Sequence, residues 1–187
     1  PVGVPATYYP DLIRRLKMAG KRVLLDSSGE ALRAGITAAP WAIKPNLAEL
    51  EELVDARLPD QAAVIHAARA LLVRGLACVL VSMGRDGALF VTADACLHAM
   101  PPEVTVKTTV GAGDAMLAGF IAGSLRGCSL ADCARLATAS ALGALTQIGP
   151  RLPAATIIES FMAQVTVRQI AATADGSAAS SQLTGSL

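Results

Sequence analysis

The stretch from Val110 to Phe120, with the sequence VGAGDAMLAGF, holds the residues whose types and spacing best suit a chemical reaction. Gly111 and Gly113 permit backbone conformations that turn consecutive N–H groups toward one point. The apolar run that follows predicts a buried helix, and the N-terminus of a helix carries partial positive charge. Asp114 stands in that first turn as the side chain able to accept a proton. The pattern indicates an anion site beside a carboxylate, which phosphoryl transfer to a hydroxyl requires.

An ordinary helix start explains the same residues, because an Asp in the first turn complements the helix dipole. Two better-known phosphate motifs do not fit. Met116 occupies the position of the third glycine in a dinucleotide fingerprint. No Gly-Lys-Ser/Thr follows the glycines, which excludes a P-loop. The spacing alone therefore leaves a functional anion site and a plain helix start both open.

Composition bounds the class of protein. The 187 residues suffice for one domain with a substantial core, and they are 53% hydrophobic and 17% charged. A net charge of +1 without a basic block argues against nucleic acid or a membrane surface as the main partner. The longest apolar run, residues 115–125, is too short to span a bilayer, and we find no secretory signal. The four cysteines lack zinc-binding spacing, so we expect reduced core thiols in a cytoplasmic protein.

The elements that must position the motif follow from hydrophobic periodicity and from turn residues. Helices are predicted over residues 5–20, 30–38, 46–55, 61–75, 114–126, 130–147 and 154–166. Strands are predicted over residues 21–26, 41–44, 77–82, 88–92 and 95–100, the last as an edge strand. In the first helix, Leu12, Ile13, Leu16 and Met18 are expected near one face. Strands alternating with helices predict an α/β fold with a largely parallel sheet over residues 1–167, followed by a flexible tail over 168–187.

Polar residues stand where three of these elements meet the expected ligand-binding edge. In open α/β sheets, ligands bind beyond the carboxyl ends of the strands. That rule selects Lys44-Pro-Asn46, Ser82-Met-Gly84 and the glycine motif at 110–114. We expect all three segments to lie together on one edge of the sheet.

Taken together, three motifs resemble the PfkB (ribokinase-like) family of sugar kinases. They are Val110-Gly-Ala-Gly-Asp114, Lys44-Pro-Asn46-Leu-Ala-Glu49 and Val81-Ser-Met-Gly84-Arg-Asp-Gly87. Within the family the sequence is most similar to the sugar-phosphate branch of 1-phosphofructokinase, minor 6-phosphofructokinase and tagatose-6-phosphate kinase. The resemblance runs from about Pro1 to about Val167 and implies a three-layer ribokinase-like fold. It also implies that the family's N-terminal half, with its lid and most sugar contacts, is missing from this chain.

The resemblance assigns catalytic roles to the glycine motif. Asp114 matches the base that takes the proton from the attacking sugar hydroxyl. Gly111, Ala112 and Gly113 match the anion hole, whose N–H groups meet the charge on the transferring phosphoryl group. Family members often hold a monovalent cation such as K⁺ behind this hole. The candidates for it here are Thr108, Val110, Ala144 and Gly149.

The other two motifs match the nucleotide and metal positions of the family. One loop would lie along ATP, although a plain hairpin turn explains it too; its residues are Ser82, Met83, Gly84, Arg85, Asp86 and Gly87. Asn46 and Glu49 match a motif tied to Mg²⁺, reached through water, and they also fit a helix-capping box. Lys44 could approach an ATP phosphate or be an ordinary exposed lysine.

Several residues carry weaker signals. Ala137, Ala141 and Gly143 offer small side chains where an adenine could lie, and core packing explains them equally well. His66 and His98 have no partners evident in sequence and are interpreted as structural or surface residues. Trp41 is interpreted as a core residue.

The resemblance therefore implies an ATP-dependent phosphotransferase acting on a hydroxyl of a sugar phosphate of the fructose 1-phosphate or fructose 6-phosphate class. The expected cofactors are ATP, Mg²⁺ and K⁺, and the intact protein is expected to be a homodimer. The alternative is a truncated, non-catalytic nucleotide-binding module. The shortened sheet predicts an exposed strand edge and apolar surface, and hence a tendency to associate.

Overall fold

The computed structural model describes residues 3–147 and 153–171, and every structural statement below concerns these residues. The helices are α1 (Tyr8–Met18), α2 (Gly29–Ile36), α3 (Leu47–Val54), α4 (Gln61–Leu72), α5 (Ala112–Leu125), α6 (Leu130–Leu145) and α7 (Ala155–Met162). The strands are β1 (Leu24–Leu25), β2 (Ala42–Ile43), β3 (Cys78–Ser82), β4 (Ala88–Val91), β5 (Cys96–Met100) and β6 (Thr166–Gln169). A short 3₁₀ turn, η1 (Gly84–Asp86), joins β3 to β4.

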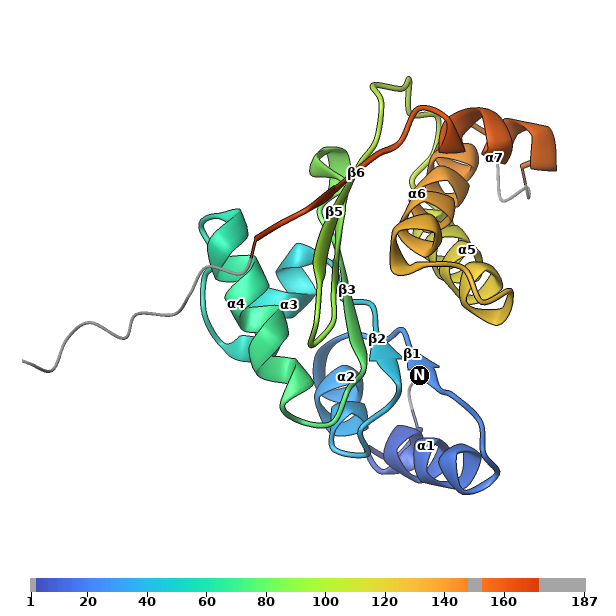
Figure 1. The fold of residues 1–187 in the computed structure, drawn as a ribbon. Coiled ribbons are helices and arrows are strands. Elements are labelled where there is room, and N and C mark those ends of the chain that lie inside the picture. Colours follow the sequence, from blue (N-terminus) through green and yellow to red (C-terminus); the bar gives the residue numbers. More distant parts are fainter. Residues whose placement is uncertain (1–2, 148–152, 172–187) are drawn as a thin grey trace, which may run out of the picture.

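The sheet is mixed, with its strands in the order β1-β2-β3-β4-β5-β6 (Figure 1). Strands β1, β2 and β3 run parallel, and β4, β5 and β6 each run antiparallel to the strand before them. The parallel half contains the helical connections α2, α3 and α4, whereas β3 and β4 are joined by the short turn η1. The predicted α/β class is confirmed, but the sheet is only half parallel because a tight hairpin can join only antiparallel strands.

Helices cover both faces of the sheet and form three layers, with α1–α4 on one side and α5–α7 on the other (Figure 1). Alternate residues of β3 separate the two cores, because successive side chains of a strand point to opposite faces. Val79 and Val81 join the core beneath α1–α4, and Leu80 joins the core beneath α5–α7. All three are fully buried, as the continuous apolar run in this strand predicts.

The end of the chain differs from the sequence prediction. Helix α7 ends at Met162, and the strand β6 follows where the helix was expected to finish. β6 pairs antiparallel with β5, so residues 96–100 form an inner strand rather than an edge strand. The β-branched residues Thr166 and Val167 favour this extended pairing. The predicted boundary at 167 thus falls inside a strand, and the rest of the predicted tail, from residue 172, lies outside the described residues.

Helix α1 buries less apolar surface than its sequence predicts. Of the four residues expected near one face, only Ile13 is buried, whereas Met18 is 88% exposed. Leu12 and Leu16 each remain more than a third exposed. The helix packs on α2 at the end of the sheet where β1, a strand of two residues, has no further neighbour among the described strands. Little of the described sheet extends beneath α1, so most of these apolar side chains stay exposed.

All four cysteines are free thiols. Cys78, Cys96 and Cys133 are buried, as expected for core thiols, and Cys128 is exposed. Burial raises the pKa of Cys78 to about 12 and raises the pKa of Cys96 and Cys133 above the ordinary value as well. No helix in the described part of the chain combines the length and apolarity needed to cross a lipid bilayer.

Candidate active site

The carboxyl ends of β2 and β3 bring two of the predicted polar segments into direct contact. The N–H of Ser82 donates to the carbonyl oxygen of Pro45 at 3.1 Å, and Asn46 and Ser82 form an isolated parallel bridge. Lys44-Pro-Asn46 and the turn after β3 therefore adjoin at one edge of the sheet. The convergence predicted for parallel strand ends is confirmed for these two segments.

The glycine motif forms the start of α5. Gly111 is the N-cap residue with a φ of +81°, a conformation that favours glycine, and no other atom lies near the place of a Cβ. Its carbonyl oxygen accepts the first helical hydrogen bond, from the N–H of Ala115. The N–H groups of the first helical turn have no acceptor within the helix, and the helix dipole adds positive potential there. Asp114 lies in this turn with its side chain exposed to solvent.

Lys44 lies directly beneath the start of α5. Its side chain is only 7% exposed, and its Nζ is 3.1 Å from Oδ2 of Asp26, at the end of β1. The same Nζ is 3.2 Å from the position that a Cβ on Gly113 would occupy. The alternative of an ordinary exposed lysine is therefore wrong. One buried ammonium links the ends of β1 and β2 to the helix that carries Asp114.

Asp26 was not among the predicted site residues, although the sequence carried a signal for it. It directly follows an apolar strand segment, and the rule that selected the ends of β2 and β3 applies equally to the end of β1. What the sequence could not supply is the partner, because Lys44 is 18 residues further along the chain. Only the parallel pairing of β1 with β2 brings the two side chains together.

Packing of aromatic and small residues fixes α5 against the sheet. The ring of Phe120 lies 5.7 Å from that of Trp41 and 5.8 Å from that of Phe90, both in stacked arrangements. On the other side of the helix, a Cβ on Gly119 would lie only 2.6 Å from Oγ of Ser140, so α5 and α6 approach closely. These contacts hold the N-terminus of α5 at the strand ends. Trp41, predicted as a core residue, is only half-buried, and it packs against the core through Phe120.

Asn46 and Glu49 form the helix-capping box that the sequence allowed. The N–H of Glu49 donates to Oδ1 of Asn46, and the N–H of Asn46 donates to Oε2 of Glu49, each at 2.9 Å. Asn46 is exposed and Glu49 is half-buried. Among the residues that the structure describes, no three His, Cys, Asp or Glu side chains are grouped closely enough to hold a metal ion. A cation at this position would therefore need further oxygen ligands from water or a bound anion.

The predicted loop after β3 is a hairpin turn that also borders a cavity. The N–H of Met83 donates to the carbonyl oxygen of Gly87 at 2.8 Å, and the N–H of Gly87 donates to that of Gly84 at 3.1 Å. Gly87 has a φ of +84°, and a Cβ there would overlap the carbonyl oxygen of Ala99 on β5. A larger residue at 87 would therefore push the turn away from the sheet. The two interpretations made from the sequence are compatible.

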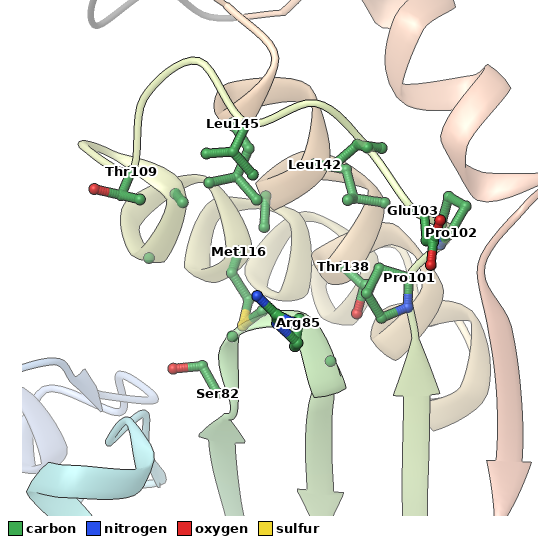
Figure 2. Close-up of a pocket in the computed structure, with 17 residues that line it drawn as sticks. Ser82, Arg85, Pro101, Pro102, Glu103, Thr109, Met116, Thr138, Leu142 and Leu145 are labelled. Atoms are coloured by element: carbon green, nitrogen blue, oxygen red, sulfur yellow. The ribbon is translucent and has the colours of Figure 1, made fainter.

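A cavity of about 700 Å³ lies between this turn and the helices α5 and α6. Figure 2 shows Ser82 and Arg85 on the sheet side of the cavity and Leu142 and Leu145 on the helical side. The predicted site residues that line it are Ser82, Gly84, Arg85, Gly87, Ala112 and Gly113. The lining does not include Gly111, Asp114, Lys44, Asn46, Glu49, Met83 or Asp86. The volume lies in the range of sites that hold small molecules, and this one opens toward the start of α5.

Many residues of the cavity wall were not predicted from the sequence. The segment after β5 contributes Pro101, Pro102 and Glu103, and α6 contributes Thr138 beside the predicted Ala141. Thr138 is only 3% exposed, and its Oγ1 has no hydrogen-bond partner among the described residues. A buried hydroxyl without a partner costs free energy, so its position in a cavity wall is informative. The signal in the sequence was a threonine between two alanines, at 137 and 139, within the helix predicted over residues 130–147.

The structure describes three of the four residues predicted to hold a monovalent cation. The N–H groups of Lys107 and Thr108 both donate to the carbonyl oxygen of Leu145, which ties the segment before α5 to the end of α6. The N–H of Val110 donates to Oγ1 of Thr108 at 3.2 Å. Thr108 and Val110 therefore lie in a segment that meets the helix end containing Ala144. Gly149 lies outside the described residues.

Comparison with known proteins identifies the class. The family model for pfkB family carbohydrate kinases matches residues 1–157. This chain is a member of the pfkB family. It is 42% identical to the 1-phosphofructokinase of Rhodobacter capsulatus over 170 residues, covering 91% of this chain and 54% of that protein. The 1-phosphofructokinase of Escherichia coli (strain K12) is also 42% identical, over 165 residues that cover 88% of this chain and 53% of the relative.

Solved structures agree with the fold. Phosphofructokinase-2 from Escherichia coli in complex with substrates and products superposes with a TM-score of 0.81 at 33% identity, covering 87% of this chain and 53% of that one. The same enzyme in complex with potassium gives a TM-score of 0.83 at 33% identity and the same coverage. The ribokinase-like fold expected from the sequence is thereby confirmed. The chain spans about half the length of the relatives that it matches.

Proposed function

We propose that this chain carries the nucleotide site and the general base of an ATP-dependent kinase that phosphorylates a hydroxyl of a sugar phosphate. The proposed substrate class is that of fructose 1-phosphate or fructose 6-phosphate, in keeping with the names of the relatives. One observation carries the proposal: the start of α5, with Asp114 in its first turn, adjoins both the buried Lys44 and the large cavity. Positive potential, a proton acceptor and room for a nucleotide thus occur at one place.

The cavity offers a nucleotide both apolar and polar lining. Its apolar residues include Pro101, Leu142 and Leu145, which would contact the base. Its polar groups, at Ser82, Arg85 and the first turn of α5, would receive the phosphates, because they combine a hydroxyl, a guanidinium and a helix N-terminus. Thr138 would supply its free hydroxyl to a polar atom of the base or ribose.

The chemistry would take place at the first turn of α5. The carboxylate of Asp114 would accept the proton of the attacking hydroxyl as the new P–O bond forms. The N–H of Gly113 would face the charge on the transferring phosphoryl group, fixed in place before the reaction. The N–H of Ala112 would join it, because its hydrogen bond to the carbonyl oxygen of Thr109 is long, at 3.5 Å. Lys44 would strengthen this potential from beneath, since it is held by Asp26 and shielded from water.

Mg²⁺ and K⁺ belong to the proposal as cofactors. Asn46 and Glu49 fit a Mg²⁺ held through water, because the capping box engages Oε2 of Glu49 and leaves Oε1 free of hydrogen bonds from described residues. The ion would neutralise phosphate charge. The segment containing Thr108 and Val110, at the end of α6, is where a monovalent cation would lie behind the anion site.

The test combines binding with turnover. Calorimetry of the chain with Mg·ATP should show saturable binding, and transfer should be assayed with fructose 1-phosphate and fructose 6-phosphate. Asp114→Asn should lower turnover by at least about 100-fold while leaving ATP affinity within a few fold. Asp132→Asn is the matched control, because Asp132 is also the third residue of its helix. Absence of ATP binding, or equal turnover in the two variants, would overturn the proposal.

A second candidate function rests on the length of the chain relative to its family. Since the chain spans about half of its relatives, it could bind a nucleotide without completing a sugar site. The exposed side chain of Asp114 fits this alternative, because nothing in the described residues encloses it. ATP binding together with undetectable transfer to either sugar phosphate would favour this binding module over the kinase.

A further inference from the structure

His98 connects the turn after β3 to helix α4 through two hydrogen bonds. Its Nε2 lies 2.6 Å from the carbonyl oxygen of Asp86, the last residue of η1. Its Nδ1 lies 2.9 Å from Nε2 of Gln61, the first residue of α4. The sequence interpretation of His98 as a structural or surface residue did not foresee these partners, which lie 12 and 37 residues away.

The two partners define the tautomer of the ring. A carbonyl oxygen can only accept a hydrogen bond, so the Nε2 of His98 carries the proton that is donated to Asp86. Nδ1 is then the acceptor, and the side-chain amide of Gln61 donates to it. The ring is thus oriented from one side by α4 and holds the turn on the other. The donor position matters, because a side chain without an N–H at this place would leave the Asp86 carbonyl unpaired.

The position of His98 in the sheet explains why its contact affects the cavity. His98 lies opposite Leu89 of β4, and Leu89 belongs to the core beneath α4, so His98 faces the side away from α5 and α6. The turn residues on either side of Asp86, namely Arg85 and Gly87, line the cavity itself. His98 therefore supports the cavity wall from behind without touching its contents.

A second contact fixes the same turn to the same strand. Gly87 lies so close to β5 that a Cβ would overlap the carbonyl oxygen of Ala99, the residue after His98. The turn is consequently attached to β5 at two successive residues, once by close backbone packing and once by the imidazole. Gly84 and Arg85 directly precede these two attachment points and are exposed, so their placement depends on the attachment.

We propose that His98 is a positioning residue for the nucleotide: it holds the turn at residues 84–87 in the conformation that places Arg85 and Gly84 on the cavity wall. The proposal rests on the proposed function where it concerns ATP, and on the geometry alone where it concerns the turn. Gln61 contributes indirectly, because its hydrogen bond to Nδ1 orients the ring of His98. Loss of the imidazole releases the turn, so that part of the nucleotide's binding free energy is used to order it again.

The experiment measures the stability of the turn and the affinity for the nucleotide separately. Amide hydrogen exchange of the nucleotide-free chain reports on Asp86 and Gly87, whose N–H groups donate within the turn. His98→Leu should speed their exchange about 3- to 10-fold and weaken Mg·ATP binding by a similar factor, the range expected for one hydrogen bond. His98→Gln should restore most of both, because the amide nitrogen of glutamine replaces Nε2 as donor. Gln61→Ala should give a smaller effect of the same sign.

His66→Leu is the matched control, because His66 is exposed on α4. The proposal is overturned if His98→Leu leaves exchange in the turn unchanged, or if His98→Gln is as impaired as His98→Leu at equal thermal stability. If the unsubstituted chain binds no ATP, the proposed function fails, and the exchange data still decide whether His98 holds the turn. Should His98→Leu fail to fold, Gln61→Ala and His98→Gln carry the same comparison.

Discussion

Lys44 and Gly113 are in contact at the centre of the candidate site, with Nζ of the lysine 3.2 Å from where a Cβ on residue 113 would be. A buried ammonium thus lies against the first turn of a helix, whose N-terminus is itself positive. Asp26, 3.1 Å from the same nitrogen, offsets part of this charge. Two positive groups held together by the fold provide a place for an anion, and the predictions below begin from this contact.

Gly113→Ala should weaken Mg·ATP binding more than it affects folding. The added Cβ would press on Nζ of Lys44 and shift it by a few tenths of an ångström, away from the phosphates. The free energy of unfolding should change by less than about 1 kcal/mol, since alanine favours the helix where glycine does not. Gly111→Ala is the contrasting variant, because its cost comes from the φ of +81° and not from an overlap. Unchanged ATP affinity in Gly113→Ala would contradict the proposed role of this contact.

Removing either partner of the Lys44–Asp26 ion pair should destabilise the chain, and the loss should be larger when Asp26 is removed. Asp26→Asn leaves a nearly buried ammonium without its counter-ion, and we expect a loss of about 2–4 kcal/mol in the free energy of unfolding. Lys44→Met leaves a carboxylate that is 29% exposed and can be hydrated, so its loss should be smaller, about 1–2 kcal/mol. Urea denaturation of both variants checks the order. The reverse order would show that Asp26, and not Lys44, is the more costly charge to leave alone.

Thr138→Val should separate binding from stability. The hydroxyl of Thr138 is buried and has no partner among the described residues, so replacing it with a methyl group should leave stability unchanged or raise it by up to about 1 kcal/mol. Mg·ATP affinity should fall about 3- to 10-fold if the hydroxyl contacts the nucleotide. Ser140→Ala is the control on the same helix, because the hydroxyl of Ser140 already donates to the carbonyl oxygen of Leu136. A loss of stability without a loss of affinity would assign Thr138 to the core alone.

The stability of the chain should fall as the pH rises above about 9. Burial raises the pKa of the Cys78 thiol from 9.0 to about 12, so the folded chain keeps a proton that the unfolded chain releases in this interval. Since the unfolded state then binds fewer protons, unfolding becomes easier with rising pH, by at most about 1.4 kcal/mol per pH unit for one thiol. Denaturation at pH 8, 9 and 10 measures the slope. Cys78→Ala should reduce the slope, and Cys128→Ala, at an exposed thiol, should not.

The exposed face of α1 should make the chain associate. Leu12 and Leu16 are more than a third exposed, and Met18 is 88% exposed. Sedimentation velocity should show assembly that increases with concentration, consistent with the dimer expected from the family resemblance. Leu16→Glu should reduce it, whereas Val73→Glu, at a residue also 88% exposed but on α4's end, should not. A monomer at all concentrations would contradict this prediction.

Local patterns were sufficient for most of the elements. Continuous apolar strands, capping residues and turn glycines located the helices and the strands as far as β5 to within a few residues, because each signal acts over a few neighbouring positions. The strand β6 was missed because its residues are mostly exposed and it is held by pairing with β5 rather than by a pattern of its own. The antiparallel half of the sheet comes from the short turns after β3 and β4 and from the pairing of β6 with β5.

Three sets of chemical groups can be identified from local sequence patterns: Asp114 after its two glycines, the capping pair of Asn46 and Glu49, and the turn at residues 84–87. Backbone conformation and helix capping depend on neighbouring residues, so these motifs are visible in the sequence. Their order and spacing indicated the family. Three relationships depend on the tertiary structure: Lys44 is buried against Asp26, the hydroxyl of Thr138 has no partner among the described residues, and His98 contacts the turn. These relationships join residues far apart in the chain, and burial and long-range hydrogen bonds arise only when the sheet and its two helical layers come together.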